Sequence, residues 1–337
     1  MGTIYDIAKQ AGVSASTVSR VINDKPGIKA STRERVQKLL RENNYTPNEA
    51  ARGLVKQSTR FIGILVEDIR VEHHNESVYV IERAMAAQGY TCITLNTGAS
   101  AAEKAECVRI LGKRQVEGAI LIGSMFSARE VAEAIERSLR EVPVMMVNGW
   151  LPLPNVYGIL VDEERGVEEC VEFLARQGHR HPAFVTDGPT PSNRSKLKGF
   201  QNALLKLGQS GGGDVVFDVP AQSLDPEEAL ERGRLVTRRI LRESPETDGV
   251  IYSTDLLAVG GLQCLAGERL SVPGRMAVIG IDNTLYGRIC TPQLTTLDNK
   301  LVEVCQNAAR VLLDSLEGKP VSHKLLLPTE VIVRQST

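Results

Sequence analysis

A short segment near the N-terminus, residues 12–23, combines one apolar stripe with a polar face. Val18, Val21 and Ile22 recur at helical spacing and predict the buried side of a helix. The opposite side of that helix would carry Ala15, Ser16, Ser19 and Arg20. Small hydrogen-bonding side chains beside one long cation suit close approach to base edges in a DNA groove. We therefore interpret this face as a surface that reads nucleic acid.

The residues on either side of this segment predict a helix-turn-helix. Residues 4–11 place apolar side chains at helical spacing, and Gly12 permits the tight turn that follows them. Ser14 is placed to cap the second helix. Residues 31–34 have the Ser-Thr-Arg-Glu pattern of a capping box, which predicts a third helix over residues 31–43. The simpler alternative is an ordinary helical hairpin without a nucleic-acid role.

The charge of the chain is divided between its two ends. Residues 1–60 contain eleven Lys and Arg against five Asp and Glu, a charge of +6, although the whole chain carries −1. A basic head on an acidic body favours a polyanionic partner for the head alone. The alternative, a solvated charged face, does not explain this segregation.

Composition also excludes several classes of protein. The sequence contains no apolar run long enough for a transmembrane helix and no apolar signal segment at its start. Its six cysteines show no C-x-x-C spacing, which argues against a zinc site or a disulfide framework. We expect a cytoplasmic protein without a metal or cofactor.

Residues 47–58 predict a marginal helix between two domains. Pro47 disfavours helical geometry at Thr46, and Asn48 is able to cap the segment that follows. Gly53 weakens this helix by roughly 1 kcal/mol relative to alanine. Such a segment would become ordered when it binds something, and the alternative is a plain linker.

Two runs of sequence together resemble the LacI/GalR family of bacterial transcription regulators. The first is Ile-Tyr-Asp-Ile-Ala at residues 4–8, followed by Gly-Val-Ser at 12–14 and Thr-Val-Ser-Arg-Val-Ile-Asn at 17–23. The second is Tyr-x-Pro-Asn-x-x-Ala-Arg-x-Leu at residues 45–54. The resemblance implies that the second helix enters the major groove and that the hinge segment folds in the minor groove. It also implies that Leu54 wedges into the central base step of the operator.

The resemblance carries a set of DNA-binding residues and a mode of assembly. The candidate DNA-contacting residues are Thr3, Tyr5, Ser14, Ala15, Ser16, Thr17, Ser19, Arg20, Asn23, Asn48, Ala51 and Leu54. A homodimer of such heads predicts a pseudo-palindromic double-stranded operator.

From residue 61 the periodicity changes to that of an α/β protein. Apolar runs at 61–66, 90–95, 118–122 and 142–147 alternate with helical patterns, as in a doubly wound parallel sheet. The alternation is repeated from residue 157 to residue 281. Two such lobes resemble the core of periplasmic sugar-binding proteins and of the LacI/GalR family.

The expected domains follow from these patterns and from the resemblance. Residues 1–46 form the helix-turn-helix head, 47–58 the hinge and 59–337 the core. The N-lobe is expected at about 60–158 plus 291–319, and the C-lobe at about 159–290 plus 320–337. The chain would cross between the lobes near 158–161, 288–294 and 318–322.

Ligands of open α/β lobes bind outside the carboxyl ends of the strands, where this sequence places many polar residues. Asp255 matches the family motif whose aspartate binds effector, and Asp282 lies in a Gly-x-Asp motif whose aspartate is more often structural. Each aspartate could equally be a helix cap. The family's usual arginine is replaced by Lys196, so that either Lys196 or Arg194 would reach the effector. The candidate effector-binding residues are Asp68, His73, His74, Trp150, Ser192, Arg194, Lys196, Asp255 and Asp282.

These residues and the resemblance predict a repressor of carbohydrate-related genes that is controlled by a sugar or sugar derivative. The cations and the two histidines also raise the hypothesis of a negatively charged effector such as a sugar acid. The alternatives are a cytoplasmic solute-binding protein or a sugar-processing enzyme on the same core. The absence of G-x-G-x-x-G, G-x-x-x-x-G-K-[ST] and G-x-S-x-G motifs disfavours an enzyme.

Overall fold

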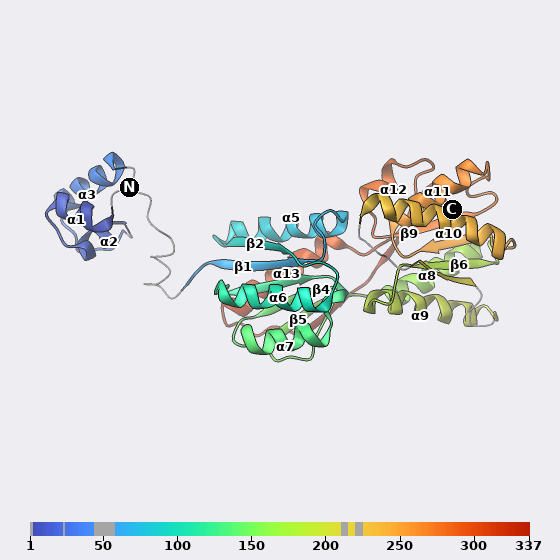
Figure 1. The fold of residues 1–337 in the computed structure, drawn as a ribbon, viewed down its shortest axis with the longest axis horizontal. Helices are drawn as coiled ribbons and strands as arrows, with labels where there is room; N and C mark the ends of the chain where they lie inside the picture. The colour runs from blue at the N-terminus through green and yellow to red at the C-terminus, as the bar shows by residue number, and fades with distance from the viewer. Residues whose placement is uncertain (1–2, 23, 44–57, 210–214, 220–224) are drawn as a thin grey trace. The chain divides into compact units, whose positions relative to one another are not determined.

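The computed structural model describes residues 3–22, 24–43, 58–209, 215–219 and 225–337. The chain divides into two units, Met1–Thr59 and Arg60–Thr337, and each has its own core. Figure 1 shows the helices of the first unit in blue and the two lobes of the second unit in the remaining colours. Apart from Ser58, the predicted hinge at 47–58 lies outside the described residues.

The first unit contains α1 (Ile4–Ala11), α2 (Ala15–Ile22) and α3 (Ala30–Glu42). Ile7, Val18 and Val36 are fully buried and hold the three helices together. Gly12 ends α1 with a φ of 63°, a left-handed conformation that glycine adopts without strain. The predicted helix-turn-helix is therefore confirmed.

The structure shows side-chain caps at the start of α1 and α2 but not at α3, where one was predicted. Thr3 and Asp6 form a capping box at α1, with the Thr3 amide donating to Asp6 at 2.8 Å. The Ser14 hydroxyl accepts from the Thr17 amide at 3.2 Å, as expected for the start of α2. The predicted capping box at residues 31–34 is wrong, because α3 begins one residue earlier and Lys29 occupies the cap position without a side-chain bond.

The first sheet of the second unit has the order β11-β5-β4-β3-β1-β2, and its pairs are all parallel. Its strands are β1 (Phe61–Val66), β2 (Thr91–Asn96), β3 (Gly118–Ile122), β4 (Val144–Val147), β5 (Val156–Val161) and β11 (Lys324–Leu327). One face packs against α5 (Glu72–Ala87) and α13 (Leu301–Leu316), and the other packs against α6 (Ala101–Lys113) and α7 (Arg129–Ser138). The inner strands β1, β3 and β4 are apolar because both faces of the sheet are covered, whereas the edge strand β2 carries exposed Thr and Asn side chains.

The second sheet has the order β12-β10-β9-β8-β6-β7, with β12 antiparallel to β10. Its strands are β6 (Pro182–Thr186), β7 (Val216–Asp218), β8 (Gly249–Tyr252), β9 (Ala277–Ile281), β10 (Thr295–Asp298) and β12 (Glu330–Ile332). The helices α8 (Glu163–Arg176) and α9 (Pro191–Lys206) pack on one face. The helices α10 (Pro226–Glu243) and α11 (Asp255–Gly267) pack on the other, and the short α12 (Leu285–Ile289) contacts α11.

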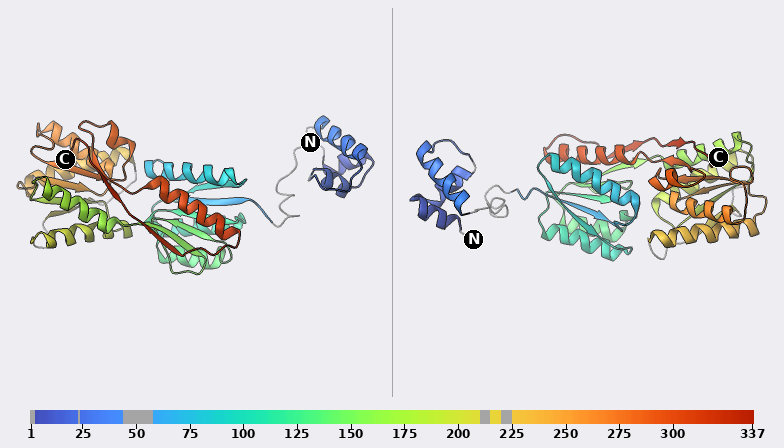
Figure 2. Two further views of the ribbon diagram at one scale, coloured as in Figure 1. Left: turned by 180° about the vertical axis from the view of Figure 1, so that it is seen from behind. Right: turned by 90° about the horizontal axis from the view of Figure 1, so that it is seen from above.

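The chain crosses between the sheets three times, as Figure 2 shows, but later than predicted. Residues 157–161 do not open the second lobe, because β5 still pairs with β4 of the first sheet. The second crossing lies between β10 and α13 rather than at 288–294, and the third between β11 and β12 rather than at 318–322. An apolar run looks alike in either sheet, and only its partner strand decides where it belongs.

Among the helices of the described residues, none combines the length and the apolar character that crossing a bilayer requires.

Candidate functional site

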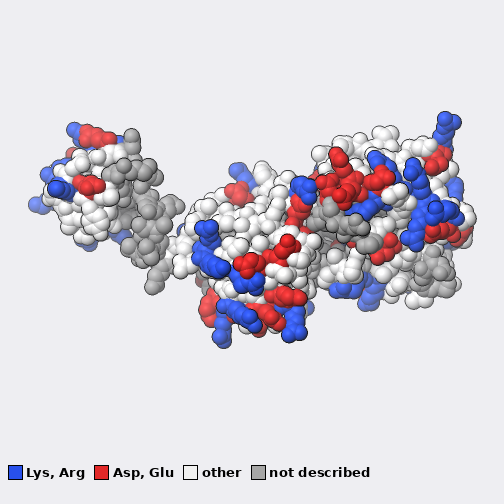
Figure 3. Space-filling view, viewed as in Figure 1, with Lys and Arg blue, Asp and Glu red and all other residues white. Residues whose placement is uncertain are grey.

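The head exposes the polar side of α2. Ser14, Ser16 and Arg20 are exposed, whereas Ala15, Thr17 and Ser19 are half-buried. The Ser14 hydroxyl lies 2.7 Å from that of Ser16 and 2.9 Å from that of Thr17, which orders the first turn of the helix. Figure 3 shows Lys and Arg side chains on the face of the head that is drawn there. The polar side of α2 carries exposed hydroxyl groups and the cation of Arg20 together, as DNA recognition requires.

The remaining candidate DNA residues fall in two groups. Tyr5 is 73% exposed in the first turn of α1, and the Thr3 hydroxyl is engaged in the capping box with Asp6. The candidates Asn23, Asn48, Ala51 and Leu54 lie outside the described residues.

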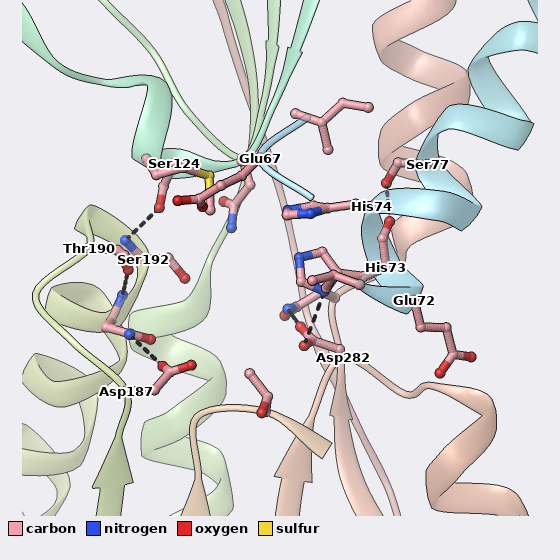
Figure 4. A pocket seen from close by; sticks show the side chains of 18 of the residues that line it. Glu67, Glu72, His73, His74, Ser77, Ser124, Asp187, Thr190, Ser192 and Asp282 are labelled. Atoms are coloured by element: carbon pink, nitrogen blue, oxygen red, sulfur yellow. Dashed lines mark hydrogen bonds and ion pairs between the residues drawn. The ribbon is translucent and has the colours of Figure 1, made fainter. Parts of the chain in front are cut away.

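A cavity of about 510 Å³ opens between the two lobes of the second unit, at the carboxyl ends of both sheets. Glu67 follows β1 and Asn148 follows β4 on the side of the first sheet. Asp187 follows β6 and Asp282 follows β9 on the side of the second sheet. Figure 4 shows Ser124 and Glu67 on one side of this space, facing Ser192 and Asp187, with both histidines projecting from α5.

The structure brings six of the nine candidate effector residues to this cavity and places three elsewhere. The six are His73, His74, Ser192, Lys196, Asp255 and Asp282. The lining does not include Asp68, which binds the Arg70 guanidinium, or Arg194, which donates to the carbonyl of Pro189. Nor does it include Trp150, whose ring lies 3.5 Å below the ammonium of Lys324. Asp68 and Arg194 have polar partners of their own, and the Trp150 ring packs against Lys324, although its buried Nε1 has no partner among the described residues. The sequence did not reveal these contacts.

Lys196 is the charged centre of the cavity wall. It is 5% exposed, and its Nζ donates to the carbonyl of Ser253 at 3.0 Å and lies 3.6 Å from Glu163 Oε1. Burial would lower the pKa of Lys196, but the carboxylates of Glu163, Asp282 and Asp187 outweigh burial and raise it. Lys196 therefore stays protonated inside the protein.

Glu163 links the lysine to both lobes. Its Oε1 accepts from the Ser192 hydroxyl at 2.7 Å and from the Asn148 amide at 3.2 Å. Asn148 has a φ of 50°, a left-handed conformation that aims its side chain across the cavity from the end of β4. The Ser192 amide also donates to the Ser124 hydroxyl at 3.2 Å, so the lobes contact each other at this wall.

Asp255 and Asp282 are buried carboxyl groups with different surroundings. Asp255 accepts at 2.6 Å from the Thr284 amide and at 2.5 Å from the Thr296 hydroxyl, so that both of its oxygens are engaged. Asp282 accepts from the Asn299 amide at 2.9 Å, and its φ of 106° is strained for a non-glycine residue. Burial raises the pKa of each carboxyl to about 7. Asp255 fixes Thr284 at the start of α12 through hydrogen bonds, whereas Asp282 keeps an oxygen towards the cavity.

The two histidines lie in the first turn of α5 rather than in a loop. Burial lowers the pKa of His73 to about 4 and that of His74 to about 3, so both rings are neutral at pH 7. The Nδ1 of His74 lies 2.9 Å from the carbonyl of Asp68, which accepts only. His74 Nδ1 therefore carries the proton, and Nε2 is an acceptor.

The comparisons with known proteins agree with this geometry. Residues 3–48 match the model of bacterial regulatory proteins of the lacI family, and residues 171–337 match a periplasmic binding protein-like domain. A transcriptional regulator of the helix-turn-helix type from Lachnoclostridium phytofermentans is 30% identical over 336 residues, covering 99% of both chains. The chain belongs to the lacI family.

Other relatives support this membership. The regulator is 29% identical to DegA of Bacillus subtilis, with 99% of this chain and 98% of DegA covered. The lac repressor dimer bound to operator and to the anti-inducer ONPF has a TM-score of 0.87 and 25% identity, covering 99% and 98% of the two chains. The complex of the regulator CelR with cellobiose has the same fold, with a TM-score of 0.72 and 23% identity over both full chains. This lacI-family chain is a DNA-binding transcriptional regulator and not an enzyme.

Several lining residues of the regulator were absent from the predicted set. These are mainly Glu67, Ser124, Asn148, Glu163, Asp187, Arg232 and Asn299. Most of them directly follow a strand, and that position was the available signal. Glu163 had none, because it reads as an ordinary acidic residue in the first turn of a helix.

We expect the substitution Asp282→Asn to change how the stability of the regulator depends on pH. The pKa of Asp282 is about 7 in the folded protein and about 3.9 in an unfolded chain. The folded state therefore holds an extra proton between these values. The stability that this proton contributes is full below about pH 4 and is lost as the pH rises through 7, by at most about 1.4 kcal/mol per pH unit. The variant should gain stability relative to the native protein as the pH rises from about 5 to 7.

Urea unfolding followed by the fluorescence of Trp150, the single tryptophan, measures this difference at each pH. The groups that face Asp282 are Lys196, Glu163, Asp187 and His73, and all are present in both proteins. Asp218→Asn, at an exposed position of β7, is the matched control. A difference between Asp282→Asn and the native protein that does not vary with pH would contradict the prediction.

Proposed function

We propose that this regulator represses carbohydrate-related genes and that a small sugar-like effector in the cavity controls its binding to DNA. The observation that carries the proposal is a cavity into which both lobes direct polar side chains, in a chain that also bears a helix-turn-helix. The ribose operon repressor of Halalkalibacterium halodurans, 27% identical over 342 residues, is among its relatives and supports a carbohydrate-related role.

In this proposal α2 reads the operator. Ala15, Ser16 and Arg20 contact bases, whereas Thr17 and Ser19 contact phosphates. The other proposed contacts are Thr3, Tyr5, Ser14, Asn23, Asn48, Ala51 and Leu54. Residues 1–46 act as the reading head and 47–58 as a hinge helix whose Leu54 unstacks the central base step.

Two chains bind one operator. A homodimer presents two heads related by a two-fold axis, so the operator is a pseudo-palindrome in the cytoplasm, where the DNA is. A ligand between the lobes binds one lobe arrangement better than another, and this difference is the free energy that couples the cavity to the heads.

Selection of tight-binding duplexes from a random-sequence DNA library tests the proposal with the full chain. We expect a pseudo-palindromic site, two chains per duplex and an affinity that falls steeply with salt concentration. Equal binding of selected and random duplexes, or one chain per duplex, would contradict it.

We expect Arg20→Ala to reduce the preference for selected over random duplexes more than it reduces the affinity for DNA in general. Loss of a contact between arginine and guanine removes about 1–3 kcal/mol of discrimination against the wrong base. Fluorescence anisotropy with selected and with random duplexes measures both quantities. Lys38→Ala removes an exposed cation from α3 and should leave the ratio of the two affinities unchanged. Equal losses on both duplexes for Arg20→Ala would count against base readout.

A further inference from the structure

Three carboxylates share a single ammonium group in the cavity wall of the second sheet. Glu163, Asp187 and Asp282 all act electrostatically on Lys196, and Glu163 is its ion-pair partner at 3.6 Å. Asp187 accepts two hydrogen bonds at 2.8 Å, from Asn193 and Ser253, but both reach the same oxygen, Oδ1. With Lys196 protonated the cluster is net negative at the cavity, and its charge approaches −2 only above the pKa of Asp282, which is about 7.

The second oxygen of Asp282 has a weak partner. Asp282 Oδ2 lies 3.9 Å from Nδ1 of His73, a ring that is neutral at pH 7 and supplies no charge. Figure 4 shows Asp187 and Asp282 along the same side of the cavity, below Ser192 and His73. A cation at this place would lie against both carboxylates.

Carboxylates hold Arg70 and Lys104, two other cations of the lining. Arg70 binds Asp68 and reaches Asp225 at 2.9 Å. Lys104 pairs with Glu67 at 3.1 Å and donates to the carbonyl of Ala99. Arg232 donates to the carbonyl of Val219 and keeps one buried donor, Nε, without a partner among the described residues. The cavity thus has little left with which to bind a carboxylate or a phosphate.

Two buried acceptors of the cavity without partners also favour a ligand that donates hydrogen bonds. His74 is 1% exposed, and its Nε2 finds no hydrogen-bond partner in the described part of the chain. Asn299 Oδ1 is in the same situation, since the amide nitrogen of Asn299 donates to Asp282. A buried acceptor without a partner is unfavourable, so the molecule that fills the cavity donates hydrogen bonds there.

We propose that the effector is a polyhydroxylated molecule with a protonated amine, whose ammonium lies against Asp187 and Asp282 and whose hydroxyl donates to His74. This inference rests on the proposed function, and it replaces the negatively charged effector that Lys196, Arg194 and the two histidines had suggested. Arg194 does not line the cavity and both histidines are neutral, and the charge of Lys196 is already balanced by Glu163, Asp187 and Asp282.

Calorimetry on the full chain with matched probes tests the inference. The probes are glucose, galactose and mannose, each as the parent hexose, the 2-amino sugar, the N-acetylated amine and the 6-phosphate. We expect an amino sugar to bind about tenfold or more tightly than its N-acetylated form, as for a hydrogen bond to a charged group. A phosphate that binds as tightly as the amine, or no binding by any amino sugar, would overturn the proposal.

Two variants locate the ammonium group. Asp187→Asn and Asp282→Asn each keep the side-chain shape, and either should remove most of the preference for the amino sugar over its N-acetylated form. Asp218→Asn, at an exposed position of β7, should keep the preference. An unchanged preference in both cavity variants would overturn the assignment.

DNA binding by the ligand-free protein, measured on the same samples, separates the two proposals. Operator binding without a preference for the amine overturns the inference alone. A native protein that fails to select an operator overturns the proposed function. Urea unfolding followed by Trp150 fluorescence shows whether the second unit of each variant is folded.

Discussion

The substitution Lys196→Met is expected to lower the free energy of unfolding of the second unit by roughly 3–5 kcal/mol near pH 8. Methionine keeps the length of the side chain but removes the ammonium that balances Glu163, Asp187 and Asp282. Breaking a buried ion pair leaves uncompensated charge in a medium of low polarity, and this penalty dominates. Part of the loss should be recovered as the pH falls from 8 through the pKa of Asp282, which is about 7 in the native protein, because protonation removes one of the unbalanced charges.

Lys198→Met is the matched control for this experiment. Lys198 lies on the same helix, and its Nζ is 3.0 Å from Glu164, but its side chain is 65% exposed. An exposed ion pair contributes about 0–1 kcal/mol, so the control should be nearly neutral. Urea unfolding followed by Trp150 fluorescence measures both variants. Similar losses for Lys196→Met and Lys198→Met would show that burial of the charge cluster has no special effect on stability.

Gly260→Ala is expected to lower the free energy of unfolding by roughly 1–3 kcal/mol, because α10 and α11 approach each other too closely for a side chain. A Cβ at Gly260 would lie 2.2 Å from the carbonyl oxygen of Leu230 and 3.0 Å from the Cα of Gly233. Both obstacles are main-chain atoms, so the two helices must separate. Because α11 begins at Asp255, such a separation also disturbs the cavity wall.

Gly267→Ala, at the C-terminal end of α11, provides the control. A Cβ at Gly267 meets no atom within 4 Å, so Gly267→Ala should be neutral or stabilising by up to about 1 kcal/mol, as alanine favours a helix. Thermal unfolding of the two variants gives the comparison. A Gly260→Ala protein as stable as the Gly267→Ala protein would contradict the close approach of the helices.

The sequence predicted those elements whose signals are local. The helix-turn-helix depends on apolar spacing within residues 4–22 and on one glycine, and the structure confirms it. The capping box of Thr3 and Asp6 at α1 was not predicted, because the search for helix caps began at the second helix. The lobe boundaries were misplaced because the residues of β5 and β10 do not show which sheet each strand joins, and only the partner strands decide it.

Among the cavity residues too, the sequence identified some correctly and misplaced or missed others. Asp255 and Asp282 were found because they match family motifs at strand ends, and Lys196 because it stands where the family usually has an arginine. Trp150 and Arg194 were chosen by residue type, and each has a nearby partner that holds it elsewhere. Glu163 was missed because its role depends on Ser192 and Asn148, which are distant in the sequence.

The sequence by itself determined the family, the reading helix and the alternation of strands and helices, since these follow from short-range spacing and side-chain type. Only the tertiary structure decided which polar groups share the cavity. Parallel strands far apart in the chain bring their carboxyl ends together, and pairing, burial and charge balance exist only once they meet. For this reason two histidines and a lysine that suggested an anion from the sequence line a cavity in which carboxylates prevail.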